Sequence, residues 1–285
     1  MVSAKDIMKS TFVKVDLNDT LSYLFGKLRQ KNQTFAVVFD KKNYKGITGR
    51  KWLLTSRIDA SKTKLKNLTQ KMSKRGTPFF VPKLKPSTDL AEICKLFAGS
   101  DTRALPVLDK NKKLVGVVTA RSVLRKIKSE YKGIPVLELA KTKLATIKMK
   151  DATGDAIKTM NRSNVDRLPV VDRFNRIAGI VTEFDILKRF HKWPPARMKY
   201  PSHADHDTWA DSGDDSGEKQ KMLKQPVSNI MTPYPMVTTA DIHSTITAVL
   251  NIMIKEDGNS IILVDNSKPA GILTVQDLML DYSRG

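Results

Sequence analysis

Residues 167–187 read RLPVVDRFNRIAGIVTEFDIL, and this stretch decides the fold. It begins with an apolar strand that ends at Asp172 and continues through a short polar turn. A second apolar strand follows, which contains Gly179 and ends at Thr182. Asp185 comes three residues later, where the pattern changes to that of an apolar helix start. Two short strands around a polar turn predict a β-hairpin that leads into a helix.

The same pattern occurs in three other places. The copies are FAVVFDKKNYKGITGRKWLL at 35–54, ALPVLDKNKKLVGVVTARSVL at 104–124 and SIILVDNSKPAGILTVQDLM at 260–279. An amphipathic helix is predicted before each copy, with Ser87 and either Asp241 or His243 near two of the expected helix starts. Each unit therefore has the order strand, helix, strand, strand, helix over about 60 residues.

This repeat resembles the CBS (cystathionine β-synthase) domain, and four copies resemble a stand-alone CBS protein of the archaeal type. Asp6-Ile7-Met8 and the segment 228–233, SNIMTP, add to the resemblance. It implies an α+β fold with α/β-like repeats, in which two tandem modules, each a pseudo-twofold pair, form a disc-like assembly. The predicted boundaries are an N-terminal module at 1–133, with repeats 1–60 and 61–133, and a C-terminal module at 134–285, with repeats 134–190 and 226–285 and a polar, acidic insertion at 191–225.

The family motif is Gly-apolar-apolar-Thr/Ser-x-x-Asp, and the resemblance implies that it binds adenosine compounds. AMP, ADP, ATP and S-adenosylmethionine are the ligands of this class, and no cofactor is required. A threonine at a helix start suits a phosphate or ribose oxygen, and a carboxylate can accept two hydrogen bonds from a ribose diol. We expect the site in the C-terminal module, where the third and fourth copies carry the full motif. The predicted residues are Thr182, Asp185, Thr274 and Asp277. Val165, Arg167 and Leu168 are expected to line one cleft, and residues 259–261, which include Asn259 and Ile261, the other.

The first two copies depart from the motif. The second has Ser122 in place of the aspartate, and the first has Gly49 and Trp52 in place of the threonine and aspartate. By resemblance, the N-terminal module has therefore lost its ribose carboxylates. A structural alternative also applies to the C-terminal pairs, because a threonine and an aspartate at a helix start are ordinary capping residues.

The charge of the chain is unevenly distributed. The formal net charge is +21 over 285 residues. Residues 1–133 hold 30 Lys and Arg against 10 Asp and Glu, whereas residues 134–285 hold 20 against 19. Because a strongly basic surface attracts polyanions, the N-terminal module is the predicted docking surface.

The basic residues predict contact with structured RNA, with the ribosome as the favoured partner, through phosphates rather than base edges. No RNA-recognition motif, zinc finger or KH loop is found in the sequence. A lysine-rich solvated surface and an anionic membrane surface remain the alternatives. The predicted residues are Lys41, Lys42, Lys45, Arg50, Lys51, Lys62, Lys64, Lys66, Lys71, Lys74, Arg75, Lys110, Lys112, Lys113, Arg121, Arg125, Lys126, Lys128 and Lys132.

Several other classes of protein are disfavoured by the sequence. The apolar runs are far shorter than the roughly 20 residues of a membrane span, and no secretory signal is evident, so we expect a cytoplasmic protein. The single cysteine, Cys94, lies on an apolar helical stripe and is predicted to be in the core. His203 and His206 lack the frame of a metal site, so we predict no metal. No catalytic motif is present, and we predict no enzyme activity.

The predicted function is therefore regulatory: the C-terminal module senses an adenosine ligand, and the basic N-terminal module docks on the ribosome or another structured RNA. Such a protein would link ribosome activity to cellular energy. The alternative is a regulatory subunit of an enzyme or transporter, controlled by AMP, ATP or S-adenosylmethionine. The sequence leaves open whether the protein forms a homodimer.

Overall fold

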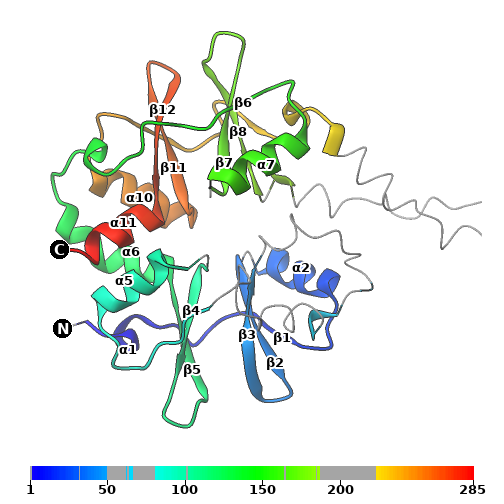
Figure 1. The fold of residues 1–285 in the computed structure, drawn as a ribbon, viewed down its shortest axis with the longest axis vertical. Helices are drawn as coiled ribbons and strands as arrows, with labels where there is room; N and C mark the ends of the chain where they lie inside the picture. The colour runs from blue at the N-terminus through cyan, green and yellow to red at the C-terminus, as the bar shows by residue number, and fades with distance from the viewer. Residues whose placement is uncertain are drawn as a thin grey trace, which may run out of the picture. The chain divides into compact units, whose positions relative to one another are not determined.

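The computed structural model describes residues 2–31, 33–49, 62, 64–66, 81–100, 102–163, 165–183, 185–186 and 223–285 (Figure 1). Four segments share one order of elements, a strand or single bridge, a helix and then two strands. The N-terminal segment comprises α1 (Ala4–Ile7), β1 (Lys14–Asp16), α2 (Leu21–Gln30), β2 (Phe35–Asp40) and β3 (Asn43–Gly49). The second comprises α5 (Leu90–Ala98), β4 (Ala104–Leu108), β5 (Leu114–Thr119) and α6 (Ala120–Ile127).

The other two segments follow the same plan. The third comprises β6 (Ile147–Lys148), α7 (Thr153–Ser163), β7 (Arg167–Val171) and β8 (Ile177–Thr182), and β9 (Thr232–Pro233) adds a fourth strand to its sheet. The fourth comprises β10 (Thr239–Asp241), α10 (Ile246–Glu256), β11 (Ser260–Asp265), β12 (Lys268–Thr274) and α11 (Val275–Tyr282). Short 3-10 turns are η1 (Lys128–Tyr131), η2 (Val136–Glu138) and η3 (Val227–Asn229).

The predicted hairpins are confirmed, and three of them are built alike. The pairs β2–β3, β4–β5 and β7–β8 are antiparallel, and each has a register shift near the end of its first strand. A residue in the left-handed conformation stands in each of these turns, namely Lys41, Lys112 and Asn175. The three hairpins therefore share the same irregularity at corresponding positions, as expected of copies of one repeat.

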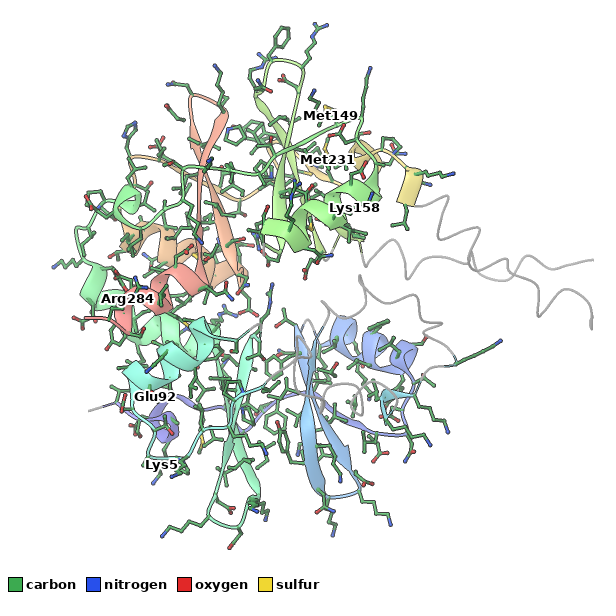
Figure 2. All side chains as sticks on the ribbon, in the orientation of Figure 1. Lys5, Glu92, Met149, Lys158, Met231 and Arg284 are labelled. Atoms are coloured by element: carbon green, nitrogen blue, oxygen red, sulfur yellow. The ribbon has the colours of Figure 1, made fainter. Side chains whose placement is uncertain are left out.

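The described chain divides into two compact units. Unit 1 contains residues 1–142, 240–263 and 271–285, and unit 2 contains residues 143–239 and 264–270. The main core of unit 1 joins helices from the second and fourth segments, because α5 packs on α11 and α6 packs on α10. Figure 2 marks these helices by Glu92 on α5 and by Arg284 just after α11. These compact units are defined by contacts, whereas the predicted modules at 1–133 and 134–285 are pairs of repeats. The predicted module boundary therefore stays a prediction.

The two hairpins of the N-terminal half pack against each other within unit 1. Phe35, Val37 and Ile47 of the first hairpin form one apolar cluster with Ala104 and Val117 of the second. Figure 1 shows the β2–β3 and β4–β5 hairpins extending in the same direction, so their turns lie at the same end of the unit. This arrangement determines where their lysines are displayed.

Cys94 is a core residue, as predicted, and its chemistry follows from its burial. The side chain is fully buried on α5, and burial raises the pKa of the thiol to about 12. Because the thiolate is the reactive form, we expect alkylation by iodoacetamide at pH 8 to be at least about a thousandfold slower than for an exposed cysteine. Mass spectrometry of labelled native and urea-unfolded protein checks this, and rapid labelling of the native chain would contradict it.

Several predictions fall on residues outside the described ranges. These are Arg50, Lys51, Trp52, Lys71, Lys74, Arg75, His203, His206 and most of the insertion at 191–225. Within the described ranges, no helix has the length and apolar character needed to cross a membrane. The same ranges contain no group of three or more His, Cys, Asp or Glu side chains that could hold a metal ion.

Candidate ligand-binding site

The predicted threonine and aspartate of the fourth copy meet at the junction between β12 and α11. The Thr274 hydroxyl donates to Oδ2 of Asp277 at 2.6 Å, and the Asp277 amide donates back to the hydroxyl at 3.1 Å. The Thr274 amide also donates to the same carboxylate oxygen at 3.1 Å. This is a capping box, in which the two side chains satisfy backbone N–H groups at the helix start. The structural alternative is therefore correct for one oxygen of Asp277.

The other oxygen of Asp277 has a different partner. Oδ1 lies 2.7 Å from Nζ of Lys141, whose backbone pairs with Ile272 just after Gly271. The Asp277 side chain is 14% exposed and that of Lys141 is 63% exposed. The helix cap therefore uses one carboxylate oxygen of Asp277. The second oxygen faces the long side chain of Lys141, which can extend into solvent instead.

The third copy has the same geometry in unit 2. The Thr182 hydroxyl donates to Oδ2 of Asp185 at 2.6 Å, and the Asp185 amide donates to the hydroxyl at 3.1 Å. Oδ1 of Asp185 is 3.5 Å from the hydroxyl of Thr232 on β9. Both full motifs thus hold their aspartate through Oδ2 and leave Oδ1 to a polar side chain from a segment that pairs with the motif strand.

The remaining predicted residues lie near these junctions. Arg167 is opposite Thr182 in the β7–β8 register, and its Nε is 3.3 Å from Asp166. Leu168 and Ile261 are buried, and Val165 is half-buried. Arg167 and Val165 therefore lie beside the third junction, while Leu168 and Ile261 contribute to the cores behind the strands.

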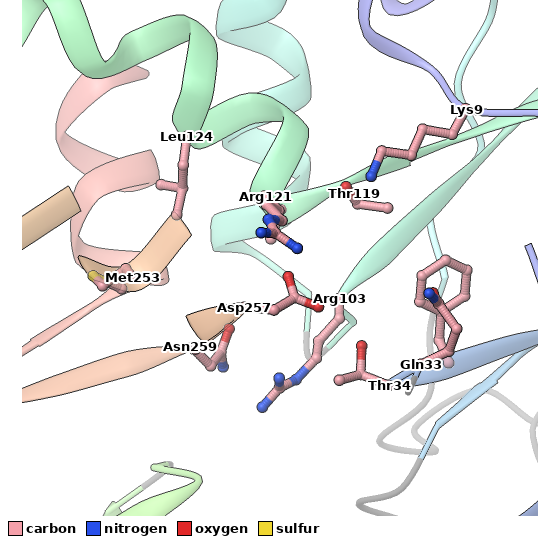
Figure 3. A pocket seen from close by; sticks show the side chains of 13 residues that line it. Lys9, Gln33, Thr34, Arg103, Thr119, Arg121, Leu124, Met253, Asp257 and Asn259 are labelled. Carbon is pink, nitrogen blue, oxygen red and sulfur yellow. The ribbon is translucent and has the colours of Figure 1, made fainter. Parts of the chain in front are cut away.

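A pocket opens in unit 1 at the junction between β5 and α6, with a volume of about 60 Å³ (Figure 3). One water needs roughly 10–15 Å³ of such space, so the pocket holds a small group rather than a whole nucleotide. Of the residues predicted to line a ligand cleft, Asn259 is among the described residues that line this pocket, whereas the four motif residues and Val165, Arg167, Leu168 and Ile261 are not. Its lining is Lys9, Gln33, Thr34, Phe35, Arg103, Thr119, Ala120, Arg121, Leu124, Met253, Asp257, Gly258 and Asn259.

Most of the polar residues of this pocket were not predicted as ligand residues from the sequence. Arg103 precedes β4, Lys9 precedes β1, and Asp257 ends α10 in a left-handed conformation. Arg103 and Asn259 occupy equivalent positions in their repeats, and the repeat pattern indicates this. Each precedes the first strand of its hairpin, and its backbone carbonyl oxygen accepts a hydrogen bond from the first helical residue of the same segment. These residues come together in one pocket only because segments far apart in the sequence pack against each other.

The predicted basic residues within the described ranges are mostly at the surface. The exposed ones are Lys41, Lys42, Lys45, Lys62, Lys64, Lys66, Lys110, Lys112, Lys113, Arg125, Lys126 and Lys132. Lys128 is half-buried and donates to Asn251 at 3.0 Å, and Arg121 lines the pocket. Six of the lysines sit on the two parallel hairpins, where side chains ending in nitrogen extend from both turns (Figure 2).

One protein family matches most of the chain. The model of the CBS domain matches residues 77–129, 136–192 and 227–283, which is more than half of the chain. These ranges include the second, third and fourth segments, whereas no match covers the first.

Two archaeal proteins are among the relatives that match over most of the chain. Uncharacterized protein MJ1404 of Methanocaldococcus jannaschii is 28% identical over 283 residues, and the match covers 96% of this chain and 60% of the relative. A 33.4 kDa protein in a ribosomal RNA operon of Thermofilum pendens is 22% identical over 204 residues, covering 71% of this chain and 62% of that one. The chain thus spans less than two thirds of the length of either relative.

The fold matches a solved structure over nearly its whole length. The crystal structure of protein MJ1225 from M. jannaschii, described as a candidate archaeal homologue of g-AMPK, has a TM-score of 0.75 at 19% identity. It covers 99% of this chain and 100% of the solved chain. A conserved protein from Pyrococcus horikoshii gives a TM-score of 0.61 at 22% identity with the same coverage. These likenesses show that the chain shares the overall fold of both solved structures.

Proposed function

The chain belongs to the CBS domain family, and we propose that it is a non-catalytic, cytoplasmic regulatory protein that senses an adenosine compound. AMP, ADP, ATP and S-adenosylmethionine are the ligands to test. One observation carries the proposal. At both full motifs the aspartate caps its helix through Oδ2, while Oδ1 contacts only the side chain of Lys141 or Thr232 among the described contacts. A ribose hydroxyl could take the place of that neighbour without loss of the helix cap.

We also propose that the N-terminal segment is a fourth, divergent CBS repeat. Its β1, α2, β2 and β3 follow the order of the other three segments, and its hairpin shares their register shift and left-handed turn residue. The departures at Gly49 and Trp52 are consistent with the absence of a family match there. A fourth repeat completes two modules of two repeats each, which is the arrangement expected from the sequence.

The test of adenosine binding removes both carboxylates. We expect the variant Asp185→Ala/Asp277→Ala to bind AMP, ATP or S-adenosylmethionine at least about tenfold more weakly at each site, because a hydrogen bond to a charged group contributes about 1.5–3 kcal/mol. Isothermal titration calorimetry measures the affinity. Asp89→Ala is the matched control, since Asp89 caps α5 through its side chain without belonging to a motif. Unchanged affinity in the double variant would exclude these carboxylates from the site.

A second function, docking on structured RNA, is favoured by the placement of six lysines. Lys41, Lys42 and Lys45 lie on one hairpin, and Lys110, Lys112 and Lys113 lie on the other. The hairpins pack together and extend in the same direction, so all six charges are displayed at one end of unit 1. A dense group of exposed cations suits a phosphate backbone, and the ribosome is the proposed partner. The relative from Thermofilum pendens, named for its place in a ribosomal RNA operon, is compatible with this.

A further inference from the structure

The turn between β7 and β8 carries an exposed aromatic side chain. Phe174 is 56% exposed, and the other residues of 173–176 are exposed as well. Figure 1 shows this turn at the free end of the hairpin, away from α7 of the same unit. An aromatic side chain contributes to stability mainly through burial, so Phe174 adds little to the stability of the fold at this place.

The turn itself does not require a phenylalanine, because the β4–β5 hairpin forms the same turn with an asparagine. Asp172 accepts hydrogen bonds through Oδ1 from the amides two and four residues later, at 2.8 and 2.9 Å. Asp109 accepts the corresponding two bonds at 2.9 and 2.8 Å. Asn111 therefore occupies the position of Phe174, and the geometry of the turn does not explain the aromatic side chain.

Two arginines lie beside the exposed ring. The guanidinium carbon of Arg173 is 4.7 Å from the centre of the Phe174 ring, and that of Arg176 is 5.0 Å from it. Asp172 orients Arg176, because its Oδ2 lies 2.9 Å from Nη2 and 3.0 Å from Nε of that guanidinium. Arginine, unlike lysine, stacks on aromatic faces and binds phosphate through two parallel hydrogen bonds. The turn thus combines a flat apolar surface with two groups suited to phosphate.

The exposed apolar surface includes a second segment next to β8. The Tyr234 amide donates to the Ala178 carbonyl oxygen at 2.9 Å, which places Tyr234 beside β8 just after β9. Tyr234 is 53% exposed and Met236 is 79% exposed. With Phe174, they are the large apolar side chains of unit 2 that are exposed among the described residues. Exposed apolar side chains that occur together indicate an interaction surface, whereas single ones are common on any protein.

The two arginines determine which partner suits this surface. An apolar partner would remove the guanidinium groups from water without supplying a counter-charge, which is unfavourable. An unpaired nucleotide supplies both parts, because its base can stack on the Phe174 ring and its phosphate can pair with a guanidinium. In a duplex the bases are stacked on one another, so RNA uses an aromatic side chain in this way where its nucleotides are unpaired.

We propose that the Phe174 surface, formed by residues 172–176 with Tyr234 and Met236, stacks unpaired bases of RNA and binds their phosphates. This inference rests on the proposed docking on RNA and deepens it by naming the part of the RNA that unit 2 contacts. The Phe174 surface differs from the six lysines of the N-terminal hairpins, because exposed lysines bind phosphate whether or not the nucleotide is paired.

The first experiment exchanges the turn while keeping its backbone. The full-length variant Arg173→Lys/Phe174→Asn/Asn175→Lys/Arg176→Lys gives the β7–β8 turn the sequence of residues 110–113, which adds one positive charge. Fluorescence anisotropy measures its binding to a single-stranded oligouridine of about 12 nucleotides and to an RNA duplex of the same length. We expect its affinity for oligouridine to fall at least about fivefold despite the added charge, because a stacking partner is lost. Its affinity for the duplex should not fall.

Single substitutions separate the ring from the charge. Phe174→Asn should weaken the binding of oligouridine about as much as the exchanged turn, and Phe174→Tyr should retain it because the ring remains. Tyr23→Asn is the matched control and should have no effect. Tyr23 is 47% exposed and has the Lys27 ammonium 5.2 Å from its ring centre, but it lies on α2 in unit 1.

Photo-crosslinking of thiouridine-labelled oligouridine, followed by mass spectrometry, identifies the contact directly. We expect the crosslinked peptide to contain Phe174. Unchanged affinity of the exchanged-turn variant for oligouridine, an equal loss of oligouridine and duplex binding in Phe174→Asn, or crosslinks only to other segments would overturn the proposal. Binding that depends on Phe174 with phosphatidylserine vesicles, but not with oligouridine, would assign the surface to a membrane and overturn it as well.

These measurements also separate the Phe174 surface from the docking on which it rests. If the protein binds neither RNA, both the docking and the Phe174 surface are rejected. If replacing the six hairpin lysines removes duplex binding while the exchanged turn changes neither affinity, the docking is retained and the Phe174 surface is rejected.

Discussion

The affinity of this protein for structured RNA is expected to fall about a thousandfold when the salt concentration rises from 50 to 200 mM. The six lysines of the two N-terminal hairpins are exposed and lie at one end of unit 1. Each phosphate that such a cation neutralises releases a counterion, and six contacts give a loss of about 10³ over this range. Filter binding of purified protein to a ribosomal RNA fragment at several salt concentrations measures the slope.

The proposal requires that RNA affinity depend on the lysines of these hairpins and not only on the net charge of the chain. Replacing all six hairpin lysines with glutamine should remove most of the salt dependence and of the affinity. A control replaces six exposed lysines elsewhere and lowers the net charge equally: Lys143, Lys148, Lys150, Lys158, Lys255 and Lys268. An equal loss in the two variants would show that the hairpins have no specific role.

The alternative function, a regulatory subunit of an enzyme or transporter, predicts a different result. Affinity purification from native lysate would then recover a protein partner that nuclease treatment does not release.

The sequence predicted the repeated hairpins well because their determinants are local. A polar turn after an apolar strand, followed by a strand and a helix start, specifies a hairpin without help from the rest of the chain. The helix starts were less predictable. The caps are Asp89 and Thr245 rather than Ser87 and Asp241 or His243, because several adjacent residues can accept a hydrogen bond and small differences in backbone path decide between them.

The candidate site was predictable only in part, for a different reason. The motif located Thr182, Asp185, Thr274 and Asp277 at the strand-to-helix junctions, where the structure has them. It could not show that one oxygen of each carboxylate belongs to a helix cap. The pocket at Thr119 depends on packing of the fourth segment against the second, and no local pattern indicates which segments pack together.

A glycine in a strand often marks close approach of another backbone, and the structure shows where this applies to the motif glycines. A Cβ on Gly179 would lie 2.5 Å from the carbonyl oxygen of Thr232 and 3.3 Å from Cα of Pro233. For Gly46, no described atom lies within 4 Å of the same position. The two glycines occupy corresponding places in their hairpins, opposite Val170 and Val38. The close approach at Gly179 is made by β9, which the hairpin pattern alone does not include.

Replacing Gly179 with valine is therefore expected to lower the free energy of unfolding by about 3 kcal/mol, because the clash is with backbone atoms that cannot rotate away. The substitution would displace β9, whose Thr232 contacts Asp185, so adenosine binding at that junction should weaken as well. Gly46→Val is the matched control, and it should change stability by less than about 1 kcal/mol, since valine favours strands and meets no described atom there. Urea denaturation followed by circular dichroism compares the two variants. Equal stability of both would contradict the role of Gly179, and a loss of stability with unchanged ligand binding would separate β9 from the site.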